Sequence, residues 1–214
     1  MFNTILPKIH KEGYKFLAIS ILATFIILIF SKFLGSVFIL ISVWVYYFFR
    51  DPDRISINDD NYLVSPADGL ITDISEKSGP EELRLENTSF TRISVFMNVF
   101  NCHVNRVPSS GKIEEIFYKP GKFLNASLDK ASEENERNYF KVRLNNGEEI
   151  IIVQIAGLIA RRIVCEVEQG QELKQGDSIG MISFGSRVDI YFKNKKLLAK
   201  LGQNVVAGES LLAS

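Results

Sequence analysis

The sequence predicts a mostly β domain, an antiparallel barrel or sandwich, preceded by an N-terminal α-helical membrane hairpin. Three observations lead to this prediction. Two uncharged apolar runs occupy the start of the chain, short alternating runs broken by turn residues occupy the rest, and one hairpin pattern occurs twice near the C-terminus. We therefore expect residues 1–54 to form a membrane anchor and residues 55–214 to form a β-rich domain.

The anchor prediction rests on residues Phe16–Phe30 and Phe33–Phe49, neither of which contains a charge. Each run is near the lower limit for crossing a hydrocarbon core of about 30 Å. Two short spans and a hairpin that enters one leaflet both fit. A cleaved signal peptide fits poorly, because a second, aromatic-rich run follows the first. A buried helix pair in a soluble protein also fits poorly, because a domain of this size cannot cover both runs.

Basic residues flank the two runs on both sides. Lys8, Lys11 and Lys15 precede the first run, and Arg50 and Arg54 follow the second. Cytoplasmic flanks are enriched in Lys and Arg. We therefore expect a cell-membrane location, with the β domain on the cytoplasmic side.

Short runs rich in β-branched residues predict the strands of the second part. Asn145-Asn146-Gly147 is a strong hairpin signal, whereas the polar segment Ser127–Asn138 is typical of an exposed loop or a short helix. The candidate strands are Leu63–Val64, Gly69–Ile74, Arg92–Asn98, Gly111–Phe117, Tyr139–Leu144, Glu149–Gln154, Arg162–Val167, Ser178–Ile182 and Arg187–Phe192.

One internal repeat indicates how these strands are organised. The segment GQELKQGDSI from Gly170 is echoed by GQNVVAGESL from Gly202, 32 residues later. Two matched hairpins of this kind predict pseudo-symmetric halves of a barrel. They resemble the turns of lipoyl- and biotinyl-type hammerhead folds, which concerns architecture rather than function.

The charge balance and the cysteines exclude some classes of function. The chain has 25 basic and 25 acidic residues, which argues against nucleic acid as a partner, because phosphate neutralisation needs clustered positive charge. Cys102 and Cys165 are far apart and lack CxxC spacing, as expected for two reduced thiols.

Three segments carry residues suited to chemistry. They are Ser65–Gly69 (SPADG), Phe96–Pro108 (FMNVFNCHVNRVP) and Phe184–Arg187 (FGSR). Taken singly, each has an ordinary structural interpretation: a β-turn, a structural histidine after an apolar strand, and a loop Gly-Ser pair.

In this order and spacing, the three segments resemble the short form of the phosphatidylserine decarboxylase family. The resemblance covers most of residues 50–192. It also includes four further stretches: Phe48–Pro52, Pro120–Ala126, Asn135–Arg137 and Gln154–Gly157.

The resemblance implies a self-cleaving proenzyme that converts phosphatidylserine to phosphatidylethanolamine and CO2. Ser186 would attack the carbonyl of Gly185, where the missing side chain leaves room and permits unusual dihedrals. Elimination and hydrolysis would leave a covalent pyruvoyl cofactor in place of Ser186. The pyruvoyl carbonyl would then form a Schiff base with the substrate amine. The fragments 1–185 and 186–214 would remain together as a heterodimer.

The same resemblance implies roles for the remaining site residues. The chain has two histidines, and His10 precedes the anchor, so His103 is the residue expected to activate the serine and to donate a proton during decarboxylation, with Asp68 as its orienting carboxylate. Long members of the family carry a second histidine at the position of Arg106, which cannot act as a base. We expect Arg106, Arg161 and Arg162 to bind the anionic headgroup.

Other classes of function fit less well. A lipoyl- or biotinyl-like carrier module without catalytic activity needs a modifiable lysine in a defined turn motif, and the repeats offer Lys174 and Val206 without that motif. A His-rich zinc peptidase cannot be assembled from one histidine outside the anchor, so no metal is expected. Soluble amino acids are disfavoured as substrates because they need no bilayer, while an ether-lipid analogue with the same headgroup stays open.

Overall fold

The computed structural model describes residues 6–122, 134–157, 162–183 and 186–214. The chain divides into two compact units, Met1–Asp53 and Arg54–Ser214. Each unit is considered by itself below.

The first unit is a pair of apolar helices, as the two apolar runs predict. Helix α2 spans Gly13–Phe30 and α3 spans Lys32–Phe48, and the short strands β1 (Lys8–Ile9) and β2 (Arg50–Asp51) pair beside them. The helices separate at Ser31, whose extended backbone breaks α2 and whose hydroxyl caps α3 by accepting from the Leu34 amide at 3.3 Å.

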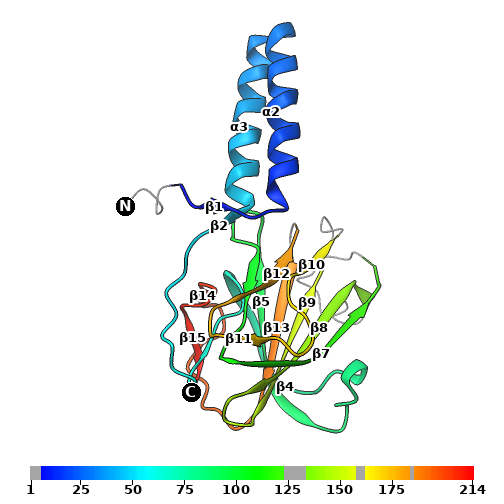
Figure 1. Cartoon of the computed structure of the whole chain (residues 1–214), viewed down its shortest axis with the longest axis vertical. Helices are drawn as coiled ribbons and strands as arrows, with labels where there is room; N and C mark the ends of the chain where they lie inside the picture. The colour runs from blue at the N-terminus through cyan, green and yellow to red at the C-terminus, as the bar shows by residue number, and fades with distance from the viewer. Residues whose placement is uncertain (1–5, 123–133, 158–161, 184–185) are drawn as a thin grey trace. The chain divides into compact units, whose positions relative to one another are not determined.

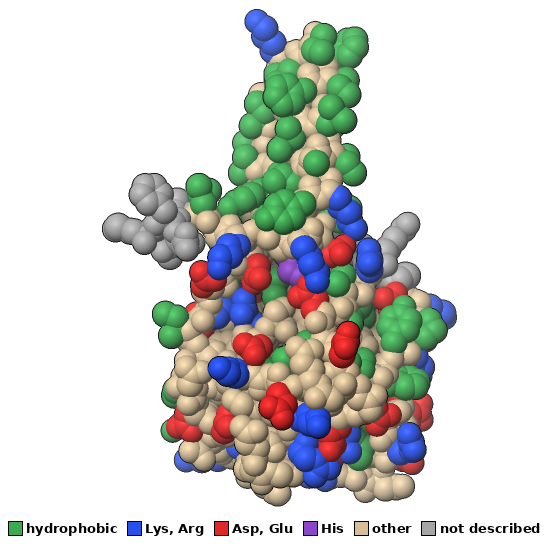
Figure 2. Space-filling model, in the orientation of Figure 1, with side chains coloured by type: hydrophobic (Ala, Val, Ile, Leu, Met, Phe, Trp, Pro, Cys, Tyr) green, Lys and Arg blue, Asp and Glu red, His purple; other side chains and the backbone are tan. Residues whose placement is uncertain are grey.

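Hydrophobic side chains cover the visible surface of this helix pair (Figure 2). Helix α2 has 18 residues and a mean hydropathy of 2.2, which makes it long and apolar enough to cross a membrane, whereas α3 is shorter. Thr24 and Ser42 lie 3.1 Å apart and share a hydrogen bond between the helices. The helix pair of the prediction is therefore confirmed.

The second unit is built around a curled antiparallel sheet of eight strands (Figure 1). Its order is β11 (Glu172–Leu173), β7 (Gly111–Lys119), β8 (Arg137–Leu144), β9 (Glu149–Ile155), β13 (Ser186–Phe192), β5 (Ser89–Met97), β4 (Gly69–Ser78) and β14 (Asn204–Val205). Smaller sheets join β10 (Ile163–Cys165), β12 (Ser178–Ile182) and β6 (Val104–Arg106), and β15 (Leu211–Ala213) with β3 (Leu63–Val64). The mostly β, antiparallel prediction is confirmed.

Strand β13 illustrates why the sheet has two different faces. Its residues alternate in direction, as strand geometry requires. Val188, Ile190 and Phe192 belong to the main apolar core inside the curl. Tyr191 points the other way and packs in a smaller cluster with Phe90, under the short 3-10 helix η1 (Glu81–Leu83).

The two repeats adopt matching turns. Gly170, Gly176, Gly202 and Gly208 all have positive φ, between 76° and 89°, a conformation that favours glycine. The hydrogen bonds match as well. The amides of Gly170 and Gly176 donate to the carbonyls of Ile113 and Val107, and those of Gly202 and Gly208 donate to Ile71 and Ser65, all at 2.8–2.9 Å. The predicted pseudo-symmetry is therefore present.

The partners of these turns form a second repeat that the sequence also contains. The segment from Pro66 (PADGLITDI) matches the segment from Pro108 (PSSGKIEEI) at four positions. Both begin long strands, β4 and β7, and both carry a register shift just after the matched isoleucine. Each half of the domain therefore combines one segment of this kind with one turn repeat.

The polar segment before β8 departs from the prediction. Residues 134–138 of the segment expected to be an exposed loop or a short helix lie in the described part, where Asn135, Glu136 and Asn138 are buried. Their polar atoms have specific partners: the Asn135 amide donates to the Ala156 carbonyl at 2.7 Å, and a Glu136 carboxylate oxygen accepts from the Ile163 amide at 3.3 Å. The exposed-loop interpretation was wrong for these residues because long-range hydrogen bonds make their burial possible.

Candidate active site

Ser186 is the first residue of β13, in the middle of the eight-stranded sheet. It pairs with Met97 of β5, and Arg187 pairs with Ile155 of β9 on the other side. Ser186 lies two residues before Val188 and four before Ile190, and residues at such spacings share one face of a strand. Its side chain therefore belongs to the inner face. It is 0% exposed, and within the described part of the chain its Oγ has no hydrogen-bond partner. A buried polar atom of this kind calls for an explanation, and catalytic chemistry is one.

Two features hold His103 near the same end of the sheet: the turn that follows β5 and a backbone hydrogen bond from the end of β12. Strand β5 ends at Met97, and a turn closed by the Asn101 amide donating to the Asn98 carbonyl leads to His103. The Ile182 amide, at the end of β12 and four residues before Ser186, donates to the His103 carbonyl at 3.3 Å. The imidazole is 0% exposed.

One contact defines the tautomer of His103. Its Nδ1 lies 3.0 Å from the backbone carbonyl oxygen of Asn101. A carbonyl oxygen can only accept, so Nδ1 carries the proton in this hydrogen bond, and the neutral ring keeps its lone pair on Nε2. The ring is thus prepared to take up a proton at Nε2.

Three buried side-chain amides, from Gln154, Asn105 and Asn138, are linked by hydrogen bonds on the inner face next to β13. The Gln154 side chain donates to Asn105 at 2.8 Å and accepts from Asn138 at 3.4 Å, and the Asn105 amide lies 3.5 Å from the sulfur of Met97. Gln154 and Asn138 were not among the expected site residues. The sequence signal that could have found them is a polar residue at an inward position of an apolar strand, as Gln154 is in EIIIVQI.

Asp68 lies just before β4, at the same end of the sheet but two strands away from β13. Both of its carboxylate oxygens accept from Arg54, at 2.8 and 2.9 Å, and one also accepts from the Ala207 amide at 2.8 Å. Arg54 as a partner of Asp68 was not expected from the sequence. The expected role of Asp68 toward His103 stays a prediction.

The candidate headgroup arginines differ in their surroundings. The Arg106 guanidinium donates to the Gly176 carbonyl at 2.9 Å, so it lies against the first repeat turn. Arg162 is exposed, and its carbonyl accepts from the Ser183 amide at 3.3 Å, three residues before Ser186. Arg161 and Gly185 lie outside the described residues.

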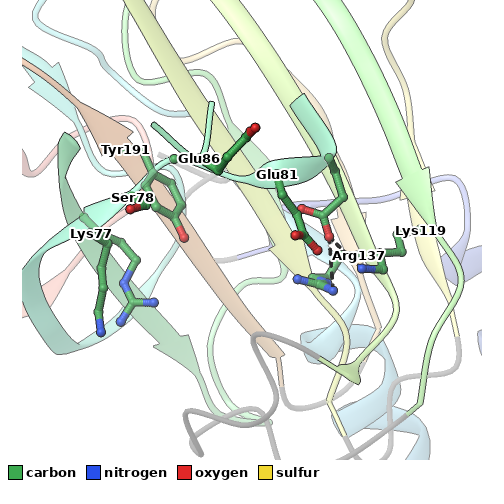
Figure 3. A pocket seen from close by; sticks show the side chains of 10 residues that line it. Lys77, Ser78, Glu81, Glu86, Lys119, Arg137 and Tyr191 are labelled. Carbon is green, nitrogen blue, oxygen red and sulfur yellow. Dashed lines mark hydrogen bonds and ion pairs between the residues drawn. The ribbon is translucent and has the colours of Figure 1, made fainter. Parts of the chain in front are cut away.

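A cavity of about 670 Å³ lies on the outer face of the sheet, where Tyr191 points (Figure 3). Arg137 and Lys119 on its wall both pair with Glu82, at 3.4 and 2.8 Å. Because Ser186 belongs to the inner face, this cavity is separate from the Ser186 site. Within the described residues, no cluster of three or more His, Cys, Asp or Glu could hold a metal ion.

Comparison with known proteins gives a consistent result. Residues 41–213 match the model of the family described as phosphatidylserine decarboxylase. The chain is 65% identical over 213 residues to a phosphatidylserine decarboxylase proenzyme of Pelagibacter ubique (strain HTCC1062), covering 100% of this chain and 99% of the relative.

Two further relatives carry the same name. The identity is 48% to the protein of Ruegeria pomeroyi, covering 100% of this chain and 98% of the relative, and 47% to that of Rickettsia akari, covering 99% and 92%. These matches do not favour the carrier-module alternative. The chain belongs to the phosphatidylserine decarboxylase family of carboxy-lyases, which act on a phospholipid.

Proposed function

We propose that this chain cleaves itself between Gly185 and Ser186, and that the resulting pyruvoyl enzyme converts phosphatidylserine to phosphatidylethanolamine and CO2. The observation that supports the proposal best is that two fully buried groups lie near the same end of the sheet: Ser186, whose Oγ has no partner in the described part of the chain, and His103, whose Nδ1 faces a backbone carbonyl.

Self-cleavage begins with the hydroxyl of Ser186 attacking the carbonyl carbon of Gly185. A serine hydroxyl is a weak nucleophile and needs a base, and His103 Nε2 takes its proton. The C–N bond breaks, the nitrogen of residue 186 is protonated, and an ester joins the two residues. Elimination then releases the Gly185 carboxylate and leaves dehydroalanine, and its hydrolysis, with loss of ammonia, gives the pyruvoyl group.

The surroundings of residue 186 fit this cofactor. The hydroxyl that is consumed makes no hydrogen bond within the described residues, so its loss breaks none there. Gln154 lies opposite Val188, two residues from residue 186, and hydrogen-bonds Asn105, and both side-chain amides can donate to a carbonyl oxygen. When present, the pyruvoyl carbonyl supplies an electron sink for the bond to the departing carboxylate. His103 then returns a proton to the product carbon.

Asp68 and the arginines have supporting roles in the proposal. Asp68, whose two carboxylate oxygens accept from Arg54 in this structure, positions His103. Arg162, which is exposed close to Ser183, together with Arg161 binds the headgroup anion, and Arg106 contributes from the repeat turn.

A phospholipid substrate and an apolar helix pair both favour a reaction at a bilayer. We propose that α2 and α3 hold the chain at the cell membrane with the β domain on the cytoplasmic side, as the basic flanks indicate. The fragments 1–185 and 186–214 stay together as a heterodimer, because β13, β14 and β15 of the small fragment all pair with strands of the large one.

Intact-mass spectrometry of the full-length chain in detergent tests this proposal. We expect two fragments, 1–185 and 186–214, with the smaller lacking a serine N-terminus, and CO2 release from phosphatidylserine. Ser186→Ala should remain one chain of 24.2 kDa without activity, and the matched control Ser183→Ala should be processed normally. Normal processing of Ser186→Ala would contradict self-cleavage by the Ser186 hydroxyl.

A His103→Ala variant tests the base separately. We expect it to cleave itself at least about 10²-fold more slowly, the contribution typical of a general base. A variant that both cleaves and decarboxylates like the wild type would remove His103 from the site.

A further inference from the structure

Four charged side chains form a line across the outer face of three neighbouring strands. Asp73 of β4 lies 2.8 Å from Arg92 of β5, which lies 3.9 Å from Asp189 of β13. Asp189 also pairs with Arg187, two residues along β13, at 2.8 Å from Nε and 3.1 Å from Nη2. The line begins at the half-exposed Asp73 and ends beside Ser186.

The inner members of this line are almost completely buried. The side chains of Arg92, Arg187 and Asp189 are 7%, 3% and 1% exposed. Although burial opposes a charged guanidinium, the neighbouring Asp189 and Asp73 raise the pKa of Arg92, so it stays protonated. Among the described residues, this line holds two cations and two anions, so its formal charges balance.

Stability does not account for buried ion pairs of this kind. Removing two ions from water costs about as much as their attraction returns, and apolar residues of the same size are often equally stable in their place. A better-supported use of buried polar groups is to specify one arrangement out of several. The question is which arrangement Arg187 and Asp189 specify.

The arrangement at stake is the register of β13. Because side chains alternate, a slip of one residue would turn Arg187 and Asp189 into the apolar interior and would turn Ser186 outward. The interior positions on the strands beside β13 include Val95, Met97, Ile152 and Gln154, none of which carries a charge that could neutralise Arg187 or Asp189. The two charged residues therefore fix which way residue 186 faces.

Self-cleavage makes this constraint more important. While the chain is intact, residue 186 is held from both sides along the backbone. After cleavage it becomes a chain terminus, and termini fray unless something ties them down. Arg187 is the first side chain after the new terminus, and Asp189 holds it.

We propose that Arg187 and Asp189 are positioning residues that hold residue 186 facing inward after self-cleavage, a role that rests on the proposed function of Ser186. They act from the opposite face of the sheet and touch neither substrate nor cofactor. Their effect should therefore fall on the rate of decarboxylation in the cleaved enzyme rather than on binding of the lipid.

The test compares the full-length wild type with the double variant Arg187→Met/Asp189→Leu, in detergent micelles that contain phosphatidylserine. The apolar pair keeps approximate volume and leaves no charge unpaired. We expect kcat to fall by about 10²-fold, the effect of a misplacement of about 1 Å, with KM near that of the wild type. Hydrogen exchange at the amides of residues 187–189 should rise in the cleaved form only.

Two companion variants sharpen the result. Asp73→Asn, at the half-exposed end of the same line, should keep kcat within about twofold, because an exposed partner contributes little. Arg187→Lys keeps the charge but not the planar fork, so it should recover part of the lost kcat. If the double variant fails to fold, Arg187→Lys decides alone: wild-type kcat and exchange would overturn the proposal, and a lowered kcat with raised exchange would support it.

Contrary outcomes are distinct from a failure of the proposed function. A double variant with wild-type kcat and exchange overturns the positioning role while the decarboxylase remains intact. Equal exchange increases in the cleaved form and in an uncleaved Ser186→Ala background also overturn it, because they would indicate a general loss of stability. A wild type that neither cleaves nor releases CO2 would overturn the proposed function itself.

Discussion

The two halves of the β domain share a backbone design, and one matched position separates them. In the half built from residues 107–116 and 170–179, the Ser110 hydroxyl accepts from the Gln175 amide at 3.2 Å. In the half built from residues 65–74 and 202–211, the Asp68 carboxylate accepts from the Ala207 amide at 2.8 Å. The turn needs only a hydrogen-bond acceptor at this position, so the charge of Asp68 exceeds what the architecture requires.

The neighbouring charges differ in the same way. Ser110 lies beside the carboxylate of Asp60, which accepts from the Ser110 amide at 3.2 Å, whereas Asp68 lies beside the guanidinium of Arg54. The comparison teaches that the repeat explains the fold, and that the charge of Asp68 is a departure from the repeat for which the proposed chemistry offers a reason.

The largest effect, on the rate of self-cleavage, is expected from replacing Asp68 by the serine that the other half has at this position. In Arg54→Gln/Asp68→Ser, a hydroxyl like that of Ser110 can still accept from the Ala207 amide, and no buried charge is left unpaired. We expect self-cleavage to slow by about 10²-fold or more, while the free energy of unfolding changes by about 1 kcal/mol. Mass spectrometry over time measures cleavage, and denaturant unfolding in a Ser186→Ala background measures stability.

Ser110→Ala serves as the matched control for that change. It removes the equivalent acceptor without touching a charge, so it should cost about 1 kcal/mol and leave self-cleavage unchanged. Wild-type cleavage by Arg54→Gln/Asp68→Ser would mean that Asp68 is only a turn residue, as Ser110 is.

The next effect concerns the glycines that begin the two long strands. A Cβ on Gly69 would lie 2.1 Å from the Phe96 carbonyl oxygen, and one on Gly111 would lie 2.4 Å from that of Arg143. Gly69→Ala and Gly111→Ala should each destabilise the uncleaved chain by about 2 kcal/mol. Gly69 should be the more sensitive, because its φ of 156° is one that other residues rarely adopt. Negligible losses in unfolding titrations would contradict the close approach at both glycines, and equal losses would contradict the added effect of φ at Gly69.

The smallest effect is the pH dependence of stability that Asp60 contributes in the half that contains Ser110. Burial opposes the charge of Asp60, but hydrogen bonds from Ser110 and Asn145 outweigh it and lower its pKa below the ordinary 3.8. A lowered folded-state pKa stabilises the chain above the unfolded pKa, and that stability is lost as pH falls through 3.8 toward the folded value.

Asp60→Asn should therefore lose stability at pH 7 and flatten the decline of Tm below about pH 4. The change in Tm at pH 7 should be about 3 °C or less, because Asp60 is only half-buried. Thermal unfolding of the uncleaved Ser186→Ala chain between pH 3 and pH 7 measures it. A decline as steep as that of the parent would assign the acid sensitivity to other carboxylates.

Much of this architecture could be predicted because it depends on local patterns. Apolar runs predicted α2 and α3, alternation predicted β4, β5 and β13 with ends wrong by a few residues, and the GQxxxxG turns predicted the pseudo-symmetry. The companion repeat at Pro66 and Pro108 shares too few residues to stand out until the hydrogen bonds pair each copy with its turn.

What could not be predicted depends on distant partners. Asn138 belongs to a polar segment that is typical of a loop. It can lie buried in a strand because its side chain hydrogen-bonds Gln154 on the neighbouring strand. The order of the motifs brought Ser186 and His103 into one hypothesis, but the pairing of Asp68 with Arg54 and the line that ends at Arg187 join residues whose proximity only the folded chain creates.

The central place of β13 has a consequence for the lifetime of the enzyme. In the cleaved form, the fragment that bears the reactive group would be a strand hydrogen-bonded on both sides, to β5 and β9. Such a peptide cannot peel away from an edge, so its departure would require the barrel to unfold. Dilution or an excess of competing peptide should then fail to exchange it, and the half-life of activity should equal the half-life of the fold. Each molecule would make its reactive group once and keep it until it unfolds.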